Sequence, residues 1–137
     1  MGISVRNIDN VDWQAPRFYL PEVRRRVVEP CRREADCPIV IGGPAAGIMP
    51  AELLEYLGVD LAVRGDGEAA FPALLAALSG GGRLEEVPGL AFRDADGVRV
   101  NEPARVGDLD ALPLPHPHRW LDLRRYLAYN GSLGVQT

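Results

Sequence analysis

Short apolar segments alternate with amphipathic ones through the first part of the chain. In residues 1–7 the apolar Ile3 and Val5 alternate with more polar neighbours, whereas residues 38–41 (PIVI) and 61–63 (LAV) are unbroken apolar runs. Alternation is typical of a half-buried strand, and a short unbroken run is typical of a strand covered on both faces. We therefore predict three β-strands.

A segment with helical spacing follows each predicted strand. The first begins at Pro21, the second runs from Pro50 to Gly58, and the third follows residues 65–68 and stops at residues 80–82. Proline suits a first helical turn and glycine suits the position after a helix. The apolar faces comprise Val23, Val27, Val28 and Cys31, then Leu53, Leu54 and Leu57, then Phe71, Leu74, Leu75 and Leu78. Pro30 should kink or restart the first helix. The alternation predicts an α/β fold, a partial doubly wound (Rossmann-like) parallel sheet with helices on its faces.

The pattern changes after the third helix. Residues 89–93 and 98–101 are strand-like and flank Asp-Ala-Asp-Gly, which predicts a C-terminal β-hairpin. Residues 102–123 are rich in proline and predict an extended linker, and Leu133 and Val135 have the spacing of a further strand. We expect three parts, with bounds at residues 1–80, 81–101 and 102–137.

Composition limits the classes of protein and partner. The chain has 137 residues, 47% hydrophobic and 25% charged, with a net charge of -4 and arginine as every basic residue. These values fit one folded domain with a tail, and they exclude wholesale disorder and a disulfide-dense scaffold. The net negative charge disfavours nucleic-acid binding. No stretch suits a membrane span or a signal peptide, so we expect a cytoplasmic protein.

The usual metal-ligating and nucleophilic residues form no recognisable site. Cys31 and Cys37 are separated by five residues, a spacing that fits neither a redox CxxC motif nor a zinc pair. His116 and His118 would lie on one side of an extended segment, but two ligands without a third make a poor site, and we expect exposed linker residues. We therefore predict no metal site and no catalytic residue in this chain.

Ligands of open parallel sheets bind beyond the carboxyl ends of the strands. The candidate loops are residues 6–12, 42–47 and 64–68, and glycine in the last two permits close approach of a flat or phosphate-bearing ligand. Equally, these glycines could serve tight turns alone. Residues 65–70 also satisfy the dinucleotide pattern G-x-G-x-x-A, but Asp66 and Glu68 would set carboxylates beside a pyrophosphate. Those two acids could instead complement the dipole of the helix that they begin.

Several segments together resemble a known family. They are residues 2–10 (GISVRNIDN), 39–43 (IVIGG), 50–60 (PAELLEYLGVD), 64–68 (RGDGE) and 87–92 (VPGLAF), followed by a Leu-Pro-x-Pro linker. In order and spacing they resemble the cobalamin (B12)-binding domain of cobalamin-dependent radical S-adenosylmethionine (SAM) enzymes, from its third strand to the linker before the radical domain. The resemblance covers nearly the whole chain.

The resemblance implies a cofactor and the residues that hold it. In this family the carboxyl ends of a five-stranded parallel sheet hold the corrin and its nucleotide tail. The residues implied along that site are Ser4, Arg6, Asn7 and Asp9, then Gly42, Gly43 and Pro44, then Gly65, Gly67 and Glu68. Ser4 would take the place of a serine that often lies near the buried tail.

Two departures from the family pattern shape the functional hypothesis. The family's first two strands would precede Met1, and its three clustered cysteines, which hold a 4Fe-4S cluster, would follow Thr137. The chain also lacks the Asp-x-His-x-x-Gly loop that some cobalamin proteins use to ligate cobalt, as do many radical members. We therefore expect a piece of a longer enzyme, with methyl transfer as a candidate reaction, that uses S-adenosylmethionine and the cluster on a small-molecule substrate.

In that hypothesis this piece binds and orients cobalamin and performs no catalysis itself. Alternatives are a stand-alone nucleotide- or cobalamin-binding α/β module, and, on residues 65–70 alone, a fragment of a dinucleotide-dependent oxidoreductase. A sheet without its first strands would keep an apolar edge, so we expect the chain alone to be marginally stable or self-associating.

Overall fold

The computed structural model describes residues 1–108, 110–113 and 116–131. The chain divides into two compact units, Met1–Gly107 and Asp108–Thr137. Among the described residues no helix has both the length and the apolar character that a membrane crossing requires.

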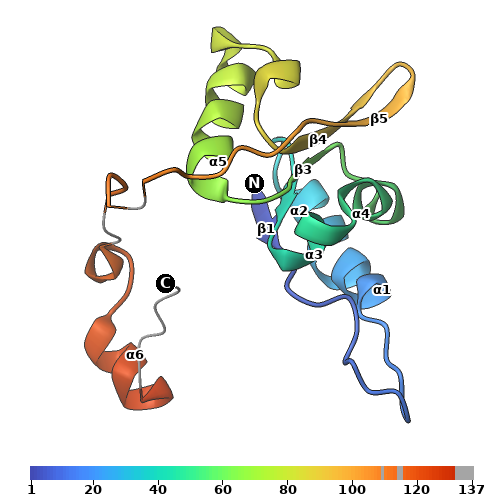
Figure 1. The fold of residues 1–137 in the computed structure, drawn as a ribbon. Coiled ribbons are helices and arrows are strands. Elements are labelled where there is room, and N and C mark those ends of the chain that lie inside the picture. Colours follow the sequence, from blue (N-terminus) through green and yellow to red (C-terminus); the bar gives the residue numbers. More distant parts are fainter. Residues whose placement is uncertain (109, 114–115, 132–137) are drawn as a thin grey trace. The chain divides into compact units, whose positions relative to one another are not determined.

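The first unit is built on one five-stranded sheet whose strands follow sequence order (Figure 1). The strands are β1 (Gly2–Ser4), β2 (Val40–Gly42), β3 (Leu61–Val63), β4 (Leu90–Asp94) and β5 (Gly97–Val100). β1, β2 and β3 are parallel, whereas β4 pairs with β3 and β5 pairs with β4 in antiparallel fashion. The predicted fold class is confirmed, and the predicted hairpin continues the sheet. The three-part division of the chain stays a prediction.

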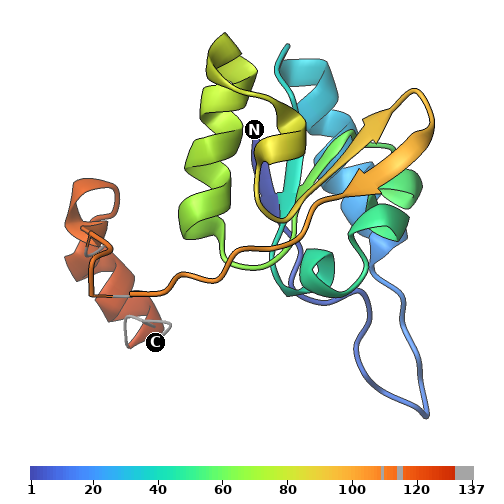
Figure 2. The same cartoon turned by 45° about the horizontal axis from the view of Figure 1, so that its top comes forward.

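Helices cover both faces of this sheet (Figures 1 and 2). One face carries α1 (Leu20–Val23), a π-helical turn (Arg24–Val28), α2 (Glu29–Glu34), α3 (Pro44–Ile48) and α4 (Pro50–Leu57); the other carries α5 (Gly67–Ala76), which continues to Gly81. The first core includes Val28, Ile39, Ile41, Leu53, Leu54, Leu57, Ala62 and Ala91, and the second includes Val40, Leu61, Val63, Ala70, Leu74, Leu90 and Phe92. Successive strand residues alternate between the two cores, as the pleat requires.

The proline and glycine residues that predicted where helices begin and end act as expected. Pro30 lies in the first turn of α2, directly after the π-helical turn, because its ring nitrogen cannot donate a hydrogen bond within the helix. Gly58 ends α4 with a φ of 68° and donates its N–H to the carbonyl of Leu54. Gly80, with a φ of 84°, ends the continuation of α5.

Arginines from three other elements bind carbonyls in the last turn of α4. Arg24 donates to the Tyr56 carbonyl (3.3 Å), Arg93 donates to the Leu54 carbonyl (3.1 Å), and Arg32 donates to the Gly58 carbonyl. Carbonyls at a helix C-terminus carry partial negative charge, which guanidinium groups neutralise. These contacts tie α4 to the first helical segment and to β4.

Two short helices were not predicted. α3 begins directly after Gly43, and α6 (Leu123–Asn130) lies in the second unit, where the proline content predicted only an extended chain. The Asp122 carboxylate caps α6 by accepting a hydrogen bond from the N–H of Arg125 (3.2 Å), a local signal that the proline-based interpretation overlooked. The strand predicted around Leu133 and Val135 lies outside the described residues.

An apolar stripe of α5 faces solvent beside the edge of the sheet. Phe71, Leu75 and Leu78 are 37%, 50% and 43% exposed, and a Cβ on Gly2 of β1 would lie 3.9 Å from the Phe71 ring. Within the described residues no strand pairs with the outer edge of β1. The stripe and the unpaired edge together form a surface that favours association between chains.

We predict that the chain self-associates through this surface and that Leu75→Glu weakens the association, because a carboxylate in an apolar interface is costly to desolvate. Sedimentation velocity over a range of protein concentrations measures the effect. Leu121→Glu, at a residue of similar exposure (45%) in the second unit, is the matched control. A wild-type chain that stays monomeric and melts cooperatively at every concentration would contradict the prediction.

Candidate functional site

The carboxyl ends of β1, β2 and β3 lie side by side at one edge of the sheet. Ser4 at the end of β1 is the register partner of Gly42 at the end of β2, and Ile41 pairs similarly with Ala62 of β3. The three predicted loops therefore leave the sheet from a common edge, as parallel strands require. Eight of the ten predicted site residues are exposed, and the other two, Asp9 and Gly42, are half-buried.

Gly43 is needed by the fold itself. Its backbone has a φ of 88° and a ψ of 177°, a conformation that is essentially restricted to glycine. A Cβ at this position would lie 2.7 Å from the Ser4 Oγ and 2.9 Å from the Val5 carbonyl oxygen. The Val5 carbonyl in turn accepts a hydrogen bond from the N–H of Ala45 (3.1 Å), which fixes the start of α3 against the end of β1.

The other predicted glycines divide into crowded and open positions. Gly65 has a φ of 88°, and a Cβ there would lie 3.4 Å from the Cβ of Pro103, so the chain after β5 covers this turn. In contrast, a Cβ on Gly42 or Gly67 would meet no atom of the structure within 4 Å. Glycine thus serves the turn at Gly65, and leaves free space at Gly42 and Gly67.

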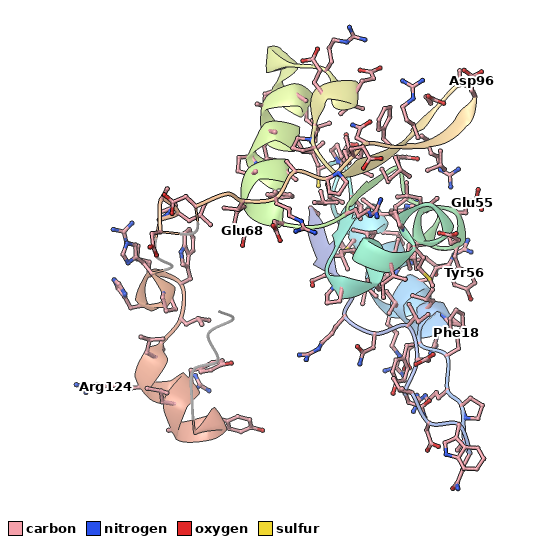
Figure 3. All side chains as sticks on the ribbon, viewed as in Figure 1. Phe18, Glu55, Tyr56, Glu68, Asp96 and Arg124 are labelled. Atoms are coloured by element: carbon pink, nitrogen blue, oxygen red, sulfur yellow. The ribbon has the colours of Figure 1, made fainter. Side chains whose placement is uncertain are left out.

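The predicted residues lie on two sides of the sheet edge. Ser4 and Gly42 belong to the α5 side, because Ile3 and Ile41 pack in the opposite core and strand residues alternate. Gly67 and the exposed Glu68 begin α5 (Figure 3). The remaining residues of the first loop, Arg6, Asn7 and Asp9, lie on the side of α3, of which Pro44 is the first residue.

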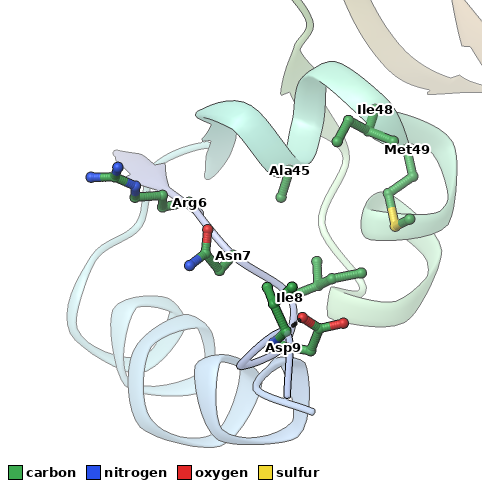
Figure 4. Close-up of a pocket in the computed structure, with 8 residues that line it drawn as sticks. Arg6, Asn7, Ile8, Asp9, Ala45, Ile48 and Met49 are labelled. Atoms are coloured by element: carbon green, nitrogen blue, oxygen red, sulfur yellow. Dashed lines mark hydrogen bonds between the residues drawn. The ribbon is translucent and has the colours of Figure 1, made fainter. Parts of the chain in front are cut away.

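A small pocket of about 160 Å³ lies on the α3 side (Figure 4). Its lining comprises Arg6, Asn7, Ile8, Asp9, Val11, Ala45, Ile48 and Met49. Within the part of the chain that the structure describes, the Arg6 and Asn7 side chains have no hydrogen-bond or ion-pair partner. The sequence indicated the polar residues, but not the apolar wall, because α3 was not predicted.

Residues 9–18 form an ordered loop that projects from the sheet edge (Figure 1). Three Asx side chains hold it: the Asp9 carboxylate accepts from the Val11 N–H (2.8 Å), the Asn10 carbonyl oxygen accepts from the Arg17 N–H (2.8 Å), and the Asp12 carboxylate accepts from the Gln14 N–H (2.9 Å). At the base of the loop, the Phe18 ring makes an edge contact with the Tyr56 ring of α4 at 5.7 Å (Figure 3).

Val11 in this loop has a φ of 55°, and it is the only described residue other than glycine with a positive φ. A β-branched side chain rarely adopts this conformation. Its strain is sustained by the hydrogen bond from its N–H to Asp9, and its side chain is 84% exposed beside the pocket.

The third loop is occupied by the chain's own contacts. The Asp66 carboxylate accepts a hydrogen bond from the Val106 N–H (3.4 Å) and makes no capping hydrogen bond to α5. Glu68 lies in the first turn of that helix, where a carboxylate complements the positive end of the helix dipole.

The cysteines and histidines, the usual metal ligands, remain scattered. Cys31 is half-buried and Cys37 is exposed, while His116 and His118 contact each other edge to face at 5.6 Å between ring centroids. In residues 1–108, 110–113 and 116–131, no group of three or more His, Cys, Asp or Glu side chains is placed to hold a metal ion.

Comparison with known proteins finds a family match for the segment that carries β2, β3 and most of the helices. Residues 15–75 match the family model described as B12 binding domain. The chain is 32% identical over 108 residues to tryptophan 2-C-methyltransferase of Streptomyces laurentii and 35% identical over 100 residues to an uncharacterized methyltransferase of Pyrococcus horikoshii. These matches cover 76% and 71% of the chain but only 18% and 21% of the relatives.

Solved structures give the same assignment. The radical SAM methyltransferase TsrM from Kitasatospora setae, with cobalamin and a [4Fe-4S] cluster bound, matches with a TM-score of 0.64 at 32% identity, over 85% of this chain and 20% of that one. The radical enzyme OxsB, with a TM-score of 0.62 at 21% identity, shows the likeness of fold alone. Residues 15–75 therefore match the B12-binding domain family, and the chain resembles the cobalamin-binding part of cobalamin-dependent radical SAM methyltransferases.

Replacing adjacent glycines separates their roles. We predict that Gly43→Ala lowers the free energy of unfolding by about 2 to 4 kcal/mol, because it combines a forbidden backbone conformation with a clash against Ser4 and Val5. Gly42→Ala, which enters free space, should change it by less than about 1 kcal/mol. Urea denaturation measures both, and equal losses would contradict the assignment.

Relieving the backbone strain in the first loop should stabilise the protein. Val11→Gly removes a cost of about 1 to 3 kcal/mol and adds about 0.5 to 1 kcal/mol of lost chain entropy, so we predict a net gain of about 1 kcal/mol. Val100→Gly, in a strand, is the control and should destabilise. The prediction fails if thermal and urea unfolding show Val11→Gly to be no more stable than the wild-type chain.

Proposed function

We propose that this chain supplies part of a cobalamin site, with the nucleotide tail of the cofactor lying over Gly42 on the α5 side of the sheet edge. The observation that carries the proposal is the free space at Gly42, where a Cβ would meet no atom within 4 Å although the residue ends a central strand. The match of residues 15–75 to the B12-binding family supports the choice of ligand.

The residues around this space suit a tail that joins a phosphate and a sugar to a flat base. Ser4 is the register partner of Gly42, and its hydroxyl, which lies next to Gly43, can donate to or accept from a sugar or phosphate oxygen. Gly67 leaves free space at the start of α5. The buried wall below, formed by Val40, Leu61 and Val63, is apolar. Such a mixture of apolar wall and few polar groups is typical of cofactor sites.

A dinucleotide site at residues 65–70 has less support. Pro103 packs against the turn at Gly65, and the Asp66 carboxylate faces the same edge as the pyrophosphate would. A carboxylate next to a phosphate group is electrostatically unfavourable. The interpretation of this motif as a helix start therefore fits better.

Where this chain forms part of a longer enzyme, we propose that its residues would hold cobalamin and that the cofactor would supply the group-transfer chemistry. The role of this chain is then to bind and orient cobalamin. The 4Fe-4S cluster, S-adenosylmethionine and a small-molecule substrate would be held by residues outside it. Transfer of a methyl group is the reaction class that the relatives' names support.

We also propose a cytoplasmic location and no nucleic-acid partner, consistent with the net charge of -4.

The proposal predicts that filling the free space at Gly42 prevents binding. Gly42→Leu should lower the affinity of the chain for hydroxocobalamin at least about tenfold, because its side chain occupies the place of the tail. Gly107→Leu, another glycine whose Cβ would meet no atom within 4 Å, is the matched control. The measurement is a titration followed by corrin absorbance and by equilibrium dialysis.

Circular dichroism and urea denaturation must show that both variants fold. A wild-type chain that binds no cobalamin would contradict the proposed function. Binding by Gly42→Leu at wild-type affinity would contradict the position of the tail.

A further inference from the structure

The segment that follows β5 is firmly anchored at its start. The half-buried Asn101 donates from its Nδ2 group to the carbonyls of Leu84 and Val87, at 2.8 Å each. The Glu102 carbonyl accepts a hydrogen bond from the N–H of Gly89 (2.9 Å). Breaking these bonds would leave partly buried polar groups without partners, which is costly. Residues 101 and 102 therefore form a fixed anchor on the first unit.

The next residues, 103–107, are held less firmly, and we call them the strap. The strap passes the start of α5 (Figures 1 and 2), and Pro103 packs there against the turn at Gly65. Within the described part of the chain, a single hydrogen bond reaches the rest of the strap, from the Val106 N–H to the Asp66 carboxylate at 3.4 Å. Val106 is half-buried, whereas the residues beside it are exposed. One long hydrogen bond thus latches the strap to the first unit.

A second position is open to the Asp66 carboxylate. Asp66 directly precedes α5, and its φ of -71° and ψ of 120° are the extended backbone conformation of a helix-capping residue. A capping aspartate accepts from the N–H of the second or third helical residue, which here are Glu68 and Ala69, but Asp66 makes no such bond. Because the backbone already suits capping, rotation of the side chain alone would move the carboxylate from the strap to the helix.

The free energies of the two positions are closely matched. Aspartate is among the best capping residues, and the bond to Val106 is long for an N–H···O hydrogen bond, so capping has a real gain to offer. Glu68 already places one carboxylate in the first turn of α5, however, which lowers the gain from a second. The balance explains why the carboxylate stays on the strap in this structure although the helix is within its reach.

We propose that Asp66 is a switch that holds the strap in one state and caps α5 in the other. In the latched state the free connection to the second unit begins at Gly107. In the released state it begins after Glu102, and the five freed residues add up to about 17 Å to its reach. The switch therefore sets the length of the free connection between the two units. No ligand takes part, so the switch is independent of the proposed cobalamin site.

The first test removes the carboxylate from the full 137-residue chain. In Asp66→Ala the amide hydrogen of Val106 should exchange with solvent about three- to tenfold faster, because the hydrogen bond that protects it is lost. The amides of Glu68 and Ala69 should change less, since Asp66 does not cap them in the latched state. NMR-detected hydrogen exchange measures each amide. Asp36→Ala, which removes another exposed carboxylate, is the matched control.

The second test removes the competing donor and keeps the carboxylate. Val106→Pro has no N–H at this position, so Asp66 should turn to α5, and the amides of Glu68 and Ala69 should exchange about three- to tenfold slower than in the wild-type chain. Ala104→Pro is the matched control, because it stiffens the same strap at a residue that makes no hydrogen bond within the described residues. Circular dichroism shows whether the proline variants fold.

Slower exchange at Glu68 and Ala69 in Val106→Pro alone, together with faster exchange at Val106 in Asp66→Ala, is the result expected of the switch. Faster exchange at Glu68 and Ala69 in Asp66→Ala, with Val106 unchanged, would make Asp66 an ordinary helix cap and overturn it. Unchanged exchange at the two helix amides in Val106→Pro, or equal slowing in both proline variants, would show that the carboxylate does not move to the helix and would also overturn it.

Discussion

The close approach of Gly43 to the end of β1 is the constraint on which the sheet edge depends. β2 turns into α3 directly beside Ser4 and Val5, and only a residue without a Cβ fits the backbone conformation and the space. The Val5 carbonyl accepts from the Ala45 N–H, and the Val5 N–H donates to the Gly42 carbonyl at 2.8 Å. The first loop and α3 are thereby fixed relative to each other, and with them both walls of the pocket between them.

Strands of only three residues suffice because contacts outside the strand ladder also fix them. β1, β2 and β3 have few ladder hydrogen bonds, so much of their position must come from packing on both faces and from the connections at their ends. α4 packs on one face of the sheet with buried Leu53, Leu54 and Leu57, and the arginines on its last carbonyls link it to β4 and to the first helical segment. A rigid edge follows from contacts that lie away from the candidate site.

The three parallel strands, the hairpin and the principal helices could be predicted because their signals are local. Apolar runs, Pro50, Gly58 and the Asp-Ala-Asp-Gly turn each act within a few residues. α3 was not predicted, because its five residues are too few to show a helical period and its position depends on the contact with β1. α6 was not predicted, because the proline-rich surroundings outweighed a single capping aspartate.

For the candidate site, sequence reasoning identified the residues but not their division. Ten residues were expected along one cobalamin site, but Ser4 and Gly42 belong to the α5 side, whereas Arg6 and Asn7, beyond the end of β1, line the pocket on the α3 side. Spacing could not tell the glycines that serve turns from those that leave space, because that depends on Pro103 and Ser4, which lie far from them in sequence. The strain at Val11 has no sequence signal at all.

Preorganisation links these observations to a binding role. A cofactor that binds to ordered loops loses less free energy to the ordering of side chains and backbone than one that must fold them. The first loop is held by Asp9, Asn10 and Asp12, the second by Gly43, and the third by Pro103 and Val106. Each loop is fixed by the chain's own contacts, while Arg6, Asn7 and the space at Gly42 remain available. An edge whose backbone is held by hydrogen bonds and whose Arg6 and Asn7 side chains are exposed to solvent suits the orientation of a large, flat cofactor.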